Sequence, residues 1–538
     1  MRVSKTVLTA FSAAMCLAAC TLAAAGVPPG TLYNVRDYGA AGDGEARDTP
    51  AIQQAVDAAS SAGGGTVYFP PGKYLSGTIF LKSLATLHLE TGATLLGSTD
   101  ISDFPQTRPK FRSYTDKYVS QSLIYAEGQH DIAITGSGTI DGQGQAFQWK
   151  EYGNRPDVIR MVSCTHVHLE GIRLQNSPMW MQHYLDCEFI TVRGIHVFNH
   201  STYNNDMIDI DCCRNVRISD CYGNSDDDAL TLKSTADRPT ENVVVTNCVL
   251  GSGCNAIKMG TESNGGFKNI SITNCVIDSW YGKKGFYALP RGIGGIVLEI
   301  VDGGTMENIT ISNIDIRNVH VPLFLRLGNR ARPFKQDMEK PGMGSYRNVV
   351  ISNIIATGLD KAGCSITGLP GHPIRGVTLS NLRLTFPGGG TAEDYRRAVP
   401  ELEDQYPEAV MFGTLPAWAL YCRHVEGLRL ENLDLVLEGA DSRPALVFDD
   451  VRGLDLDGLT EKRQDSPSAP LMVLRDVAGA GFRACRPVDS TPVFLLLEGA
   501  VQRIMASGND LSGVTKPFEL GPGVPVGALF QGGNLIKE

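Results

Sequence analysis

The sequence predicts an all-β protein that folds as a single solenoid, a right-handed parallel β-helix, with a short capping helix near its N-terminus. Three observations lead to this prediction. A short phrase built on Asn and β-branched residues recurs along the chain, its first copies stand 27 residues apart, and no helical pattern separates them. A period of this size made of short strands is typical of a solenoid, in which each coil buries its apolar residues against its neighbours.

The composition is that of a globular chain rich in turns. Of 538 residues, 42% are hydrophobic and 20% are charged, with 59 glycines, which excludes a disordered or collagen-like chain. The formal net charge of -10 argues against a nucleic-acid-binding surface. It leaves room for a local basic groove that binds an acidic sugar.

Residues 1–25 have the pattern of an export signal. Arg2 and Lys5 supply a positive start, and residues 7–22 form an apolar stretch too short to span a bilayer comfortably. A lipoprotein signal would end before Cys20, which would then be lipidated and attach the protein to a membrane, whereas an ordinary signal would end after Ala25. We therefore expect an exported protein, located in the periplasm, on the outer membrane as a lipoprotein, or outside the cell.

Residues 30–110 are predicted to form the N-terminal cap and the first coils. An Asp or Thr N-cap followed by Pro50 predicts a helix over residues 50–62. Its apolar residues recur at helical spacing, and a run of glycines ends it. Such a helix can cover the open end of a solenoid. Short strands separated by turn residues are expected at 66–69, 78–81, 86–89 and 132–134.

Residues 111–538 are predicted to form the β-helix itself, with inserted loops and a C-terminal extension. Asn at the same turn of successive coils can form a hydrogen-bonded ladder. The spacing widens to 39 and then 40 residues between the later phrases, which indicates inserted loops, and such loops usually carry a binding surface. Residues 388–417 interrupt the repeat and are interpreted as a long loop or short helix packed on the solenoid. The repeated phrase begins at Asn215, Asn242, Asn269, Asn308 and Asn348.

The cysteines are expected to be structural. Eleven of them follow the predicted signal, an odd number without a short-loop disulfide framework. Cys221, Cys248 and Cys275 stand 27 residues apart, where small apolar side chains would stack from coil to coil. The spacing is not that of a zinc site, so we predict buried thiols and no bound metal.

Two acidic segments indicate the functional site. Aligning residues 206–210 on residues 228–232 gives the same apolar alternation at a separation of 22, which is one tight coil. Adjacent parallel strands lie about 4.8 Å apart, so equivalent side chains of successive coils should be neighbours. Two columns are expected: Asp206, Asp228 and Asn255 in one, and Asp209, Thr231 and Lys258 in the other.

Stacked carboxylates suit acid–base chemistry. Carboxylates at such distances raise one another's pKa, and their repulsion destabilises the fold. A purely structural role would therefore not explain them. A carboxyl that is kept protonated can protonate a glycosidic oxygen, while an ionised partner activates water. Inverting hydrolases hold the two groups about 6.5–9.5 Å apart to admit that water, and diagonal positions on adjacent coils could supply this gap.

The segments 204–209, 227–229 and 176–180, together with His183 and Cys187, resemble the polygalacturonase family, glycoside hydrolase family 28. The resemblance runs from Tyr33 to about residue 360. It implies a β-helix hydrolase that inverts configuration without a cofactor. By the same resemblance, Asp227 would be the general acid, and Asp206 and Asp228 would position and deprotonate the water.

The chain departs from the family in two places. Polygalacturonases carry Gly-His-Gly one coil after the paired aspartates, and then an Arg-Ile-Lys that holds the substrate carboxylate. The matching residues here are 253–255 (Gly-Cys-Asn) and 287–289 (Tyr-Ala-Leu), so the carboxylate-binding subsite is expected to differ. Arg suits bidentate capture of a carboxylate, and the inserted loop carries Arg330 and Arg332 as further candidates. The predicted substrate-binding residues are His183, Asn205, Lys233, Asn255, Lys258, Glu262, Arg291, Glu299 and Arg326.

The sequence therefore predicts a glycoside hydrolase that acts as a monomer, without cofactor, on a uronic-acid-containing pectic polysaccharide or oligosaccharide. It does not choose between internal cleavage and release from a chain end, although inserted loops could block a groove. One alternative is a lyase or epimerase, in which clustered aspartates hold Ca²⁺ and Lys or Arg abstracts a proton. Another is a non-catalytic glycan-binding solenoid, favoured by the lost His and Arg-Ile-Lys elements.

Overall fold

The computed structural model describes residues 32–279 and 290–537. The predicted export signal with Cys20, and the Tyr-Ala-Leu segment at 287–289, lie outside the described residues.

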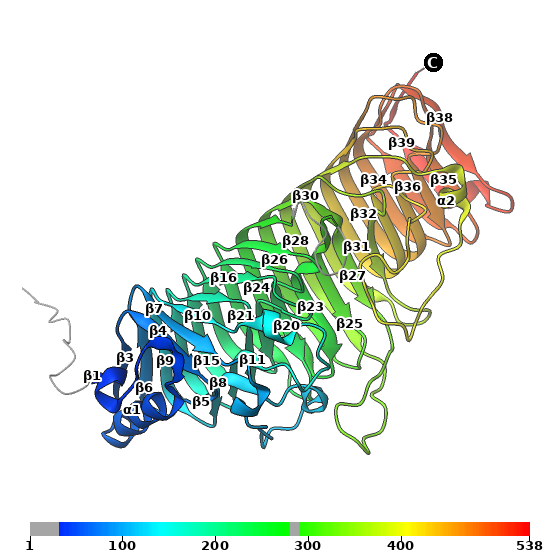
Figure 1. The fold of residues 1–538 in the computed structure, drawn as a ribbon. Coiled ribbons are helices and arrows are strands. Elements are labelled where there is room, and N and C mark those ends of the chain that lie inside the picture. The colour runs from blue at the N-terminus through cyan, green and yellow to red at the C-terminus, as the bar shows by residue number, and fades with distance from the viewer. Residues whose placement is uncertain (1–31, 280–289, 538) are drawn as a thin grey trace, which may run out of the picture.

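The described chain winds into a right-handed parallel β-helix, as predicted (Figure 1). Through the first half of the solenoid each coil contributes three strands, because each strand pairs with the strand three places along the chain and all the named ladders are parallel. Further on, consecutive strands merge into longer ones that turn a corner without a break, such as β24 (Gly266–Asp278). The coils therefore form three parallel faces around one apolar core.

We call the first face the site sheet, because it holds the acidic segments. Its strands are β5 (Ile79–Phe80), β8 (Ser122–Glu127), β11 (Asp157–Val162), β14 (Gln182–Leu185), β17 (Ile208–Asp211), β20 (Leu230–Ser234), β23 (Asn255–Ser263), β25 (Gly292–Ile300), β27 (Val319–Leu327), β29 (Cys364–Thr367), β31 (Leu420–Leu437), β32 (Leu446–Arg463), β33 (Met472–Arg475), β35 (Thr491–Glu498) and β38 (Val514–Leu520).

The second face, the ladder sheet, carries the repeated Asn phrase. Its strands are β1 (Leu32–Asn34), β3 (Gly65–Phe69), β6 (Ala85–Leu89), β9 (His130–Gly136), β12 (Thr165–Glu170), β15 (Glu188–Arg193), β18 (Arg214–Ser219), β21 (Thr240–Thr246), β24, β26 (Thr305–Arg317), β28 (Ser345–Thr357), β30 (Ile374–Phe386), β31, β32, β34 (Ala478–Arg486), β36 (Gln502–Ser507) and β39 (Leu529–Gly532).

The third face completes each coil and merges into β24. Its strands are β2 (Asp43–Arg47), β4 (Gly72–Ser76), β7 (Ala93–Gly97), β10 (Thr139–Asp141), β13 (Arg173–Gln175), β16 (His196–Asn199), β19 (Tyr222–Ser225) and β22 (Val249–Ser252). A separate short pair, β37 (Asp510–Leu511) and β40 (Leu535–Ile536), lies near the C-terminal end.

Helix α1 (Thr49–Ser61) lies at the N-terminal end of the solenoid, as predicted (Figure 1). Its buried residues include Ile52, Val56 and Ala59, which join the main core. The predicted Asp cap differs in detail: the Asp48 side chain makes no cap hydrogen bond to the helix. Its carboxylate instead accepts from the amides of Ala41 and Gly42, at 2.7 and 3.0 Å, and so fixes the preceding turn.

The predicted Asn ladder is confirmed on the ladder sheet. Asn242, Asn269, Asn308 and Asn348 each donate from Nδ2 to the Oδ1 of the Asn one coil before, at 3.1 to 3.4 Å. All have left-handed backbone φ angles, which Asn tolerates better than most residues. The predicted stacking of Cys221, Cys248 and Cys275 is also observed, since all three are buried and each stands one residue before a paired position of β19, β22 or β24.

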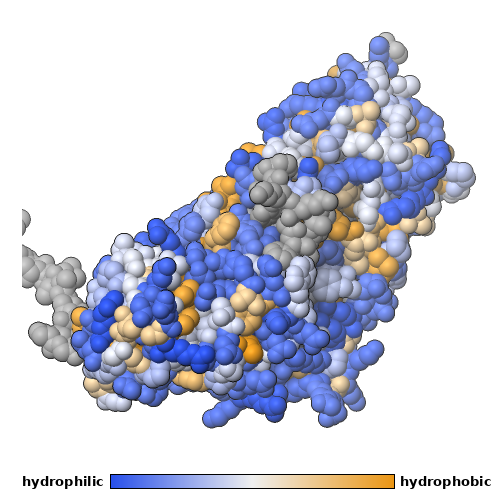
Figure 2. Space-filling view, in the orientation of Figure 1, coloured by the Kyte–Doolittle hydropathy of each residue, from blue (hydrophilic) through white to orange (hydrophobic). Residues whose placement is uncertain are grey.

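Residues 387–419 pack on the site sheet and include the short helix α2 (Ala392–Arg396). The visible face of the molecule is largely hydrophilic, with scattered apolar residues (Figure 2). Among the described residues, no helix is long and apolar enough to cross a membrane.

Candidate active site

The acidic residues lie where two successive coils enter the site sheet. Asp206 stands just before β17, and Asp227 and Asp228 stand just before β20. The Met207 amide donates to the Asp228 carbonyl at 2.9 Å, and the Ala229 amide donates to the Asn255 carbonyl at 3.0 Å. These bonds place Asp206, Asp228 and Asn255 on consecutive coils, which confirms the first predicted column.

The strand register confirms the second column. Asp209 on β17 pairs with Thr231 on β20, and Thr231 pairs with Lys258 on β23. The predicted period therefore aligned both the charged residues and the apolar residues between them.

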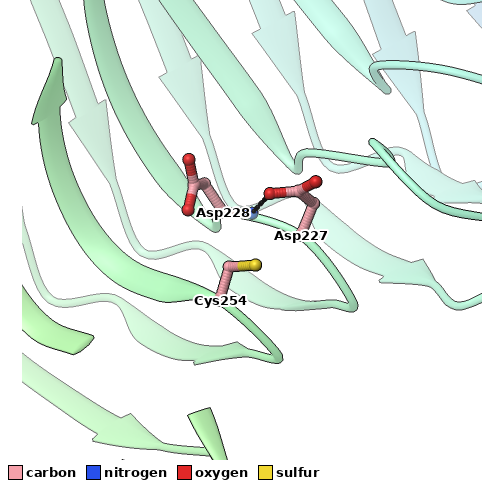
Figure 3. Close-up of side chains that lie close together, drawn as sticks. All are labelled: Asp227, Asp228 and Cys254. Carbon is pink, nitrogen blue, oxygen red and sulfur yellow. Dashed lines mark hydrogen bonds between the residues drawn. The ribbon is translucent and has the colours of Figure 1, made fainter. Parts of the chain in front are cut away.

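Side-chain and backbone bonds fix the orientation of the paired aspartates. The Asp227 amide donates to Asn205 Oδ1 at 3.0 Å, and the Asp228 amide donates to Asp227 Oδ1 at 2.9 Å (Figure 3). Asn204 Nδ2 donates to the other Asp227 oxygen at 3.4 Å. Asn205 is fully buried, so its contact with Asp227 is a positioning contact and differs from the predicted contact with substrate.

Two buried lysines balance the carboxylates. Lys258 Nζ lies 2.9 Å from Asp228 Oδ2. Lys233 Nζ lies 3.4 to 3.6 Å from oxygens of Asp209, Asp206 and Glu262. Burial opposes the charged form of each lysine, but the surrounding carboxylates outweigh it and raise the pKa of both ammonium groups. Both lysines therefore remain cationic.

The carboxylates differ in their affinity for protons. Burial, and then the charges of Asp209 and Asp227, raise the pKa of Asp206 well above its usual value. Burial also raises the pKa of Asp209 to about 7, although Lys233 opposes the shift. The pKa of Glu262 is lowered, because Lys233 and Arg332 outweigh its burial. Within this group some carboxyls hold protons near neutral pH while Glu262 is ionised.

These residues surround a cavity of about 280 Å³. Lys233 lies 4.8 Å from the Trp180 ring, and Arg332 lies 4.0 Å from the Tyr114 ring, so aromatic faces pair with the cations. The lining residues are Tyr114, Tyr118, Tyr152, Met179, Trp180, Asn204, Asp206, Asp227, Asp228, Lys233, Lys258, Glu262, Arg332 and Tyr406.

Six of the nine predicted substrate-binding residues are absent from this lining: Asn205, described above, and His183, Asn255, Arg291, Glu299 and Arg326. His183 is fully buried, and its Nε2 lies 3.1 Å from Asp211 Oδ2. Glu299 is fully buried and has no hydrogen-bond partner. Arg326 Nη2 donates to the Glu401 carbonyl at 2.6 Å, and Arg291 Nη1 donates to the Leu359 carbonyl at 2.7 Å. Both arginines hold backbone, so their donors are engaged away from the cavity.

Asn255 is also buried, and its Nδ2 donates to Asp228 Oδ1 at 2.9 Å. It therefore orients a carboxylate of the site. By contrast, Lys233, Lys258 and Glu262 do line the cavity, and so does Arg332 from the inserted loop.

The tyrosines of the lining are the residues that the sequence did not reveal. Tyr114, Tyr118 and Tyr152 lie on segments between strands of the first coils, and Tyr406 lies on the 387–419 segment. Insertions have no repeat register, so a periodic pattern cannot place them. For Tyr406 the sequence offered one signal: it precedes Pro407 within residues 388–417, which interrupt the repeat.

Asp227, Asp228 and Cys254 are the described side chains that group closely enough to hold a metal ion, with atoms within 4.8 Å of one another (Figure 3). Burial, and then the two carboxylates, raise the pKa of the Cys254 thiol. A protonated thiol is a poor metal ligand, and Asp228 already has Lys258 as its partner. These donors do not fit a resident metal ion.

The fold and the site together define a parallel β-helix with a carboxylate-lined cavity. Residues 65–398 match the family model of Glycosyl hydrolases family 28, and the chain belongs to this family. It is 37% identical over 215 residues to a probable polygalacturonase of Vitis vinifera, with 37% of this chain and 43% of the relative covered. It is also 37% identical over 134 residues to an exo-poly-α-D-galacturonosidase of Dickeya chrysanthemi, with 23% and 21% covered. The chain thus matches less than half the length of these relatives.

Solved structures share the fold. An exopolygalacturonase of Thermotoga maritima aligns with a TM-score of 0.56 at 24% identity, over 66% of this chain and 88% of its own. A family 28 exopolygalacturonase of Yersinia enterocolitica aligns with a TM-score of 0.50 at 18% identity, over 84% and 78%. At these identities the likeness establishes the β-helix fold.

Proposed function

We propose that the protein is a glycoside hydrolase that cleaves a uronic-acid-containing pectic polysaccharide or oligosaccharide with inversion of configuration. The observation that carries the proposal is the placement of Asp206, Asp227 and Asp228 on two adjacent coils beside one cavity. Family membership supports the reaction class, and the names of the relatives point to pectic substrates.

Asp228 is the carboxylate best suited to accept a proton from the attacking water. The Lys258 ammonium lies 2.9 Å from one of its oxygens, so a cation faces this carboxylate. Asn255 Nδ2 donates to one of its oxygens, which fixes the carboxylate in the cavity wall. Asp206, on the preceding coil, helps to position the same water.

Asp227 is assigned as the general acid, as the resemblance implies. Its side chain is oriented by Asn204 Nδ2 and by the Asp228 amide. Burial, and then the charges of Asp209 and Asp227, raise the pKa of the neighbouring Asp206, which favours a proton on that carboxyl. In this mechanism Asp227 delivers a proton to the glycosidic oxygen while water attacks the anomeric carbon from the other face.

The cations of the lining support an acidic substrate. Lys233, Lys258 and Arg332 all reach the cavity, and an arginine can bind a carboxylate through two donors. None corresponds to the family's Arg-Ile-Lys arrangement, so these residues would bind a uronate in a different way.

The test compares Asp227→Asn with Asp226→Asn on defined pectic oligosaccharides, with the product anomer followed by NMR. Asp226 is the matched control, because it is buried in the same loop but lies 3.0 Å from His200 and outside the lining. We expect an inverted product from the wild type, a loss of about 10²–10⁴-fold in kcat/KM for Asp227→Asn, and near wild-type activity for Asp226→Asn.

Three results would overturn the proposal in different ways. A product of retained configuration would contradict the single displacement. An unsaturated product that chelation abolishes would indicate a Ca²⁺-dependent lyase. Binding without turnover by the wild-type protein would indicate a glycan-binding solenoid.

A further inference from the structure

The outward-facing side chains of the site sheet are buried along almost the whole solenoid. Strand register aligns one such column across consecutive coils, and every member is at most 6% exposed. An open groove for a polysaccharide would leave this column exposed on several neighbouring coils. Its members are Tyr125, Arg160, His183, Asp209, Thr231, Lys258, Val297, Phe324, Ser365, Tyr421, Val447 and Val473.

The N-terminal side of the cavity is closed by the segment before β8. The Val119 carbonyl accepts from Arg160 Nη1, so this segment lies directly on the β11 coil. The Tyr118 ring packs edge-on against Trp180, with centroids 5.8 Å apart, and Val119 and Met179 complete this small apolar cluster. A sugar chain therefore cannot continue along the sheet past Trp180.

The C-terminal side is closed by residues 399–415, which we call the strap. Val399, Ala409, Phe412 and Leu415 form an apolar cluster with the outward side chains of the site sheet, including Phe324. The Phe412 and Phe324 rings lie 6.4 Å apart. The strap covers the coils that follow the one carrying Lys258.

Two arginines, the buried Arg326 and the partly exposed Arg423, fasten the strap to the solenoid. Arg326 Nη2 donates to the carbonyls of Glu401 and Leu402, at 2.6 and 3.2 Å. Arg423 Nη1 donates to the Val399 carbonyl at 2.6 Å, and its guanidinium also pairs with Glu401. This explains why Arg326, predicted to bind substrate, is found beneath the strap.

The two remaining sides are also walled. The Tyr114 amide donates to the Thr235 carbonyl at 2.8 Å, which closes the side where β20 ends. Tyr152 lies in the lining and stacks with Arg155, whose guanidinium carbon is 5.1 Å from the ring. At about 280 Å³ the cavity is slightly below the usual range of small-ligand pockets, about 300–1,000 Å³.

We infer that the enzyme acts at a chain end, receiving the terminal sugar unit in a cavity walled on both sides along the sheet and leaving the rest of the chain outside. Internal cleavage needs two exits, one for the chain on each side of the scissile bond. The segment before β8 and the strap stand across the sheet on the two sides of the cavity, so a chain bound there cannot continue along the sheet in both directions. The inference rests on the proposed hydrolase function and specifies its mode of action.

End-modified substrates test this mode directly. The wild-type protein is given galacturonan and rhamnogalacturonan oligosaccharides of one defined length in three forms: unmodified, reduced at the reducing end, and carrying an unsaturated residue at the non-reducing end. Chain-end action predicts that one modification lowers kcat/KM at least tenfold and the other has little effect. It also predicts release of the smallest product from polymer, with little early loss of chain length.

Hydrolysis of both modified forms at the unmodified rate, with products of mixed length, would overturn chain-end action and leave the hydrolase proposal intact. No hydrolysis of any form would instead count against the proposed function. Phe412→Ala, which loosens the strap, should increase the share of mid-length products. Phe530→Ala is its control, because Phe530 is exposed on β39 near the C-terminal end. The modified substrates remain decisive even if Phe412→Ala fails to fold.

Discussion

The Asn ladder and the two columns that hold Asp206, Asp228 and Asp209, here called the acidic columns, arise from the same coil register. Stacking has opposite effects on the free energy of folding in the two cases. In the ladder, the Asn269 amide donates to Asn242 and accepts from Asn308, at 3.2 and 3.1 Å. An amide has donors and acceptors, so identical amides satisfy one another when stacked. Ionised carboxylates only accept, so stacking Asp206 and Asp228 leaves repulsion that protons or cations must offset.

At the acidic columns the structure offsets the repulsion with both cations and protons. Lys258 pairs with Asp228, and Lys233 lies among three carboxylates, while Asp206 has a raised pKa. The ladder needs no such support along several successive coils. In the proposed mechanism the acidic columns serve the chemistry, and we expect them to reduce stability, whereas we expect the amide column to stabilise the fold.

Asp206→Asn should have the largest effect of these variants, on activity. It separates a role in chemistry from a role in stability most clearly. Removing one member of the carboxylate cluster is expected to lower kcat/KM by about 10²–10⁴-fold. The free energy of unfolding should not fall, because the pKa of Asp206 is raised and a neutral amide replaces a carboxyl whose charged form is costly to bury. Kinetics and chemical denaturation of the same preparation measure both quantities.

The control for this variant is Asp220→Asn, an exposed aspartate that accepts from Asn247 at 3.3 Å. This change replaces a carboxylate by an amide in the structural part of the solenoid. It should leave both activity and stability close to wild type. A large drop in stability for Asp206→Asn would mean that its charge supports the fold, contrary to the comparison.

Lys258→Met should be the next largest effect, measured on stability. It leaves Asp228 buried and without its partner at 2.9 Å, and breaking a buried pair on one side costs about 3–5 kcal/mol. Lys258→Met combined with Asp228→Asn should recover most of this loss, since no unpaired charge then remains. If the double variant is as unstable as the single one, the lysine acts through packing and not through charge.

The pH dependence of stability provides a third, smaller test. The folded-state pKa of Asp209 is raised to about 7, above the unfolded value near 3.9. Between these values the native state holds a proton that the unfolded chain has lost, so this group makes stability fall as pH rises from about 4 to 7.

Asp209→Asn cannot titrate and should flatten that slope. Denaturant unfolding at pH 4.5 and 7.5 should show wild type losing on the order of 1–3 kcal/mol more than the variant over this interval. Parallel curves for the two proteins would show that Asp209 does not hold a proton in the native state.

The repeating part of the molecule was predictable from the sequence, and the inserted part was not. The 27-residue phrase located the Asn ladder and the cysteine stack, and the coil alignment brought Asp206, Asp228 and Lys258 together. These succeed because period and register translate directly into position along a solenoid. Tyr118, Phe412 and Tyr406 lie on insertions, where position depends on long-range packing.

The partners of the predicted arginines could not be read from the sequence, for a related physical reason. Arg326 and Arg291 have the right chemistry for a substrate carboxylate, but backbone carbonyls of distant segments bind equally well to a guanidinium. Those segments, at Glu401 and at Leu359, lie 75 and 68 residues away along the chain. Residue type therefore shows that an arginine is a strong hydrogen-bond donor, whereas only the tertiary contacts show which partner it binds.

Asn269→Ala and Asn269→Gly should have the smallest effect on stability. Together they separate the hydrogen bonds of the ladder from the tolerance of Asn for left-handed backbone. Asn269 is exposed and has a φ of 55°. Alanine loses both the ladder bonds and the tolerance for left-handed backbone, and should cost about 1–2 kcal/mol. Glycine adopts the left-handed backbone freely and loses mainly the hydrogen bonds, so it should cost about 0.5–1 kcal/mol.

Denaturant unfolding measures the stability of both variants. Activity should remain at the wild-type level, because the ladder lies on a different face from the cavity. If both variants are as stable as the wild type, the hydrogen bonds of the amide column contribute nothing to stability. The contrast with the acidic columns would then depend on the carboxylates alone.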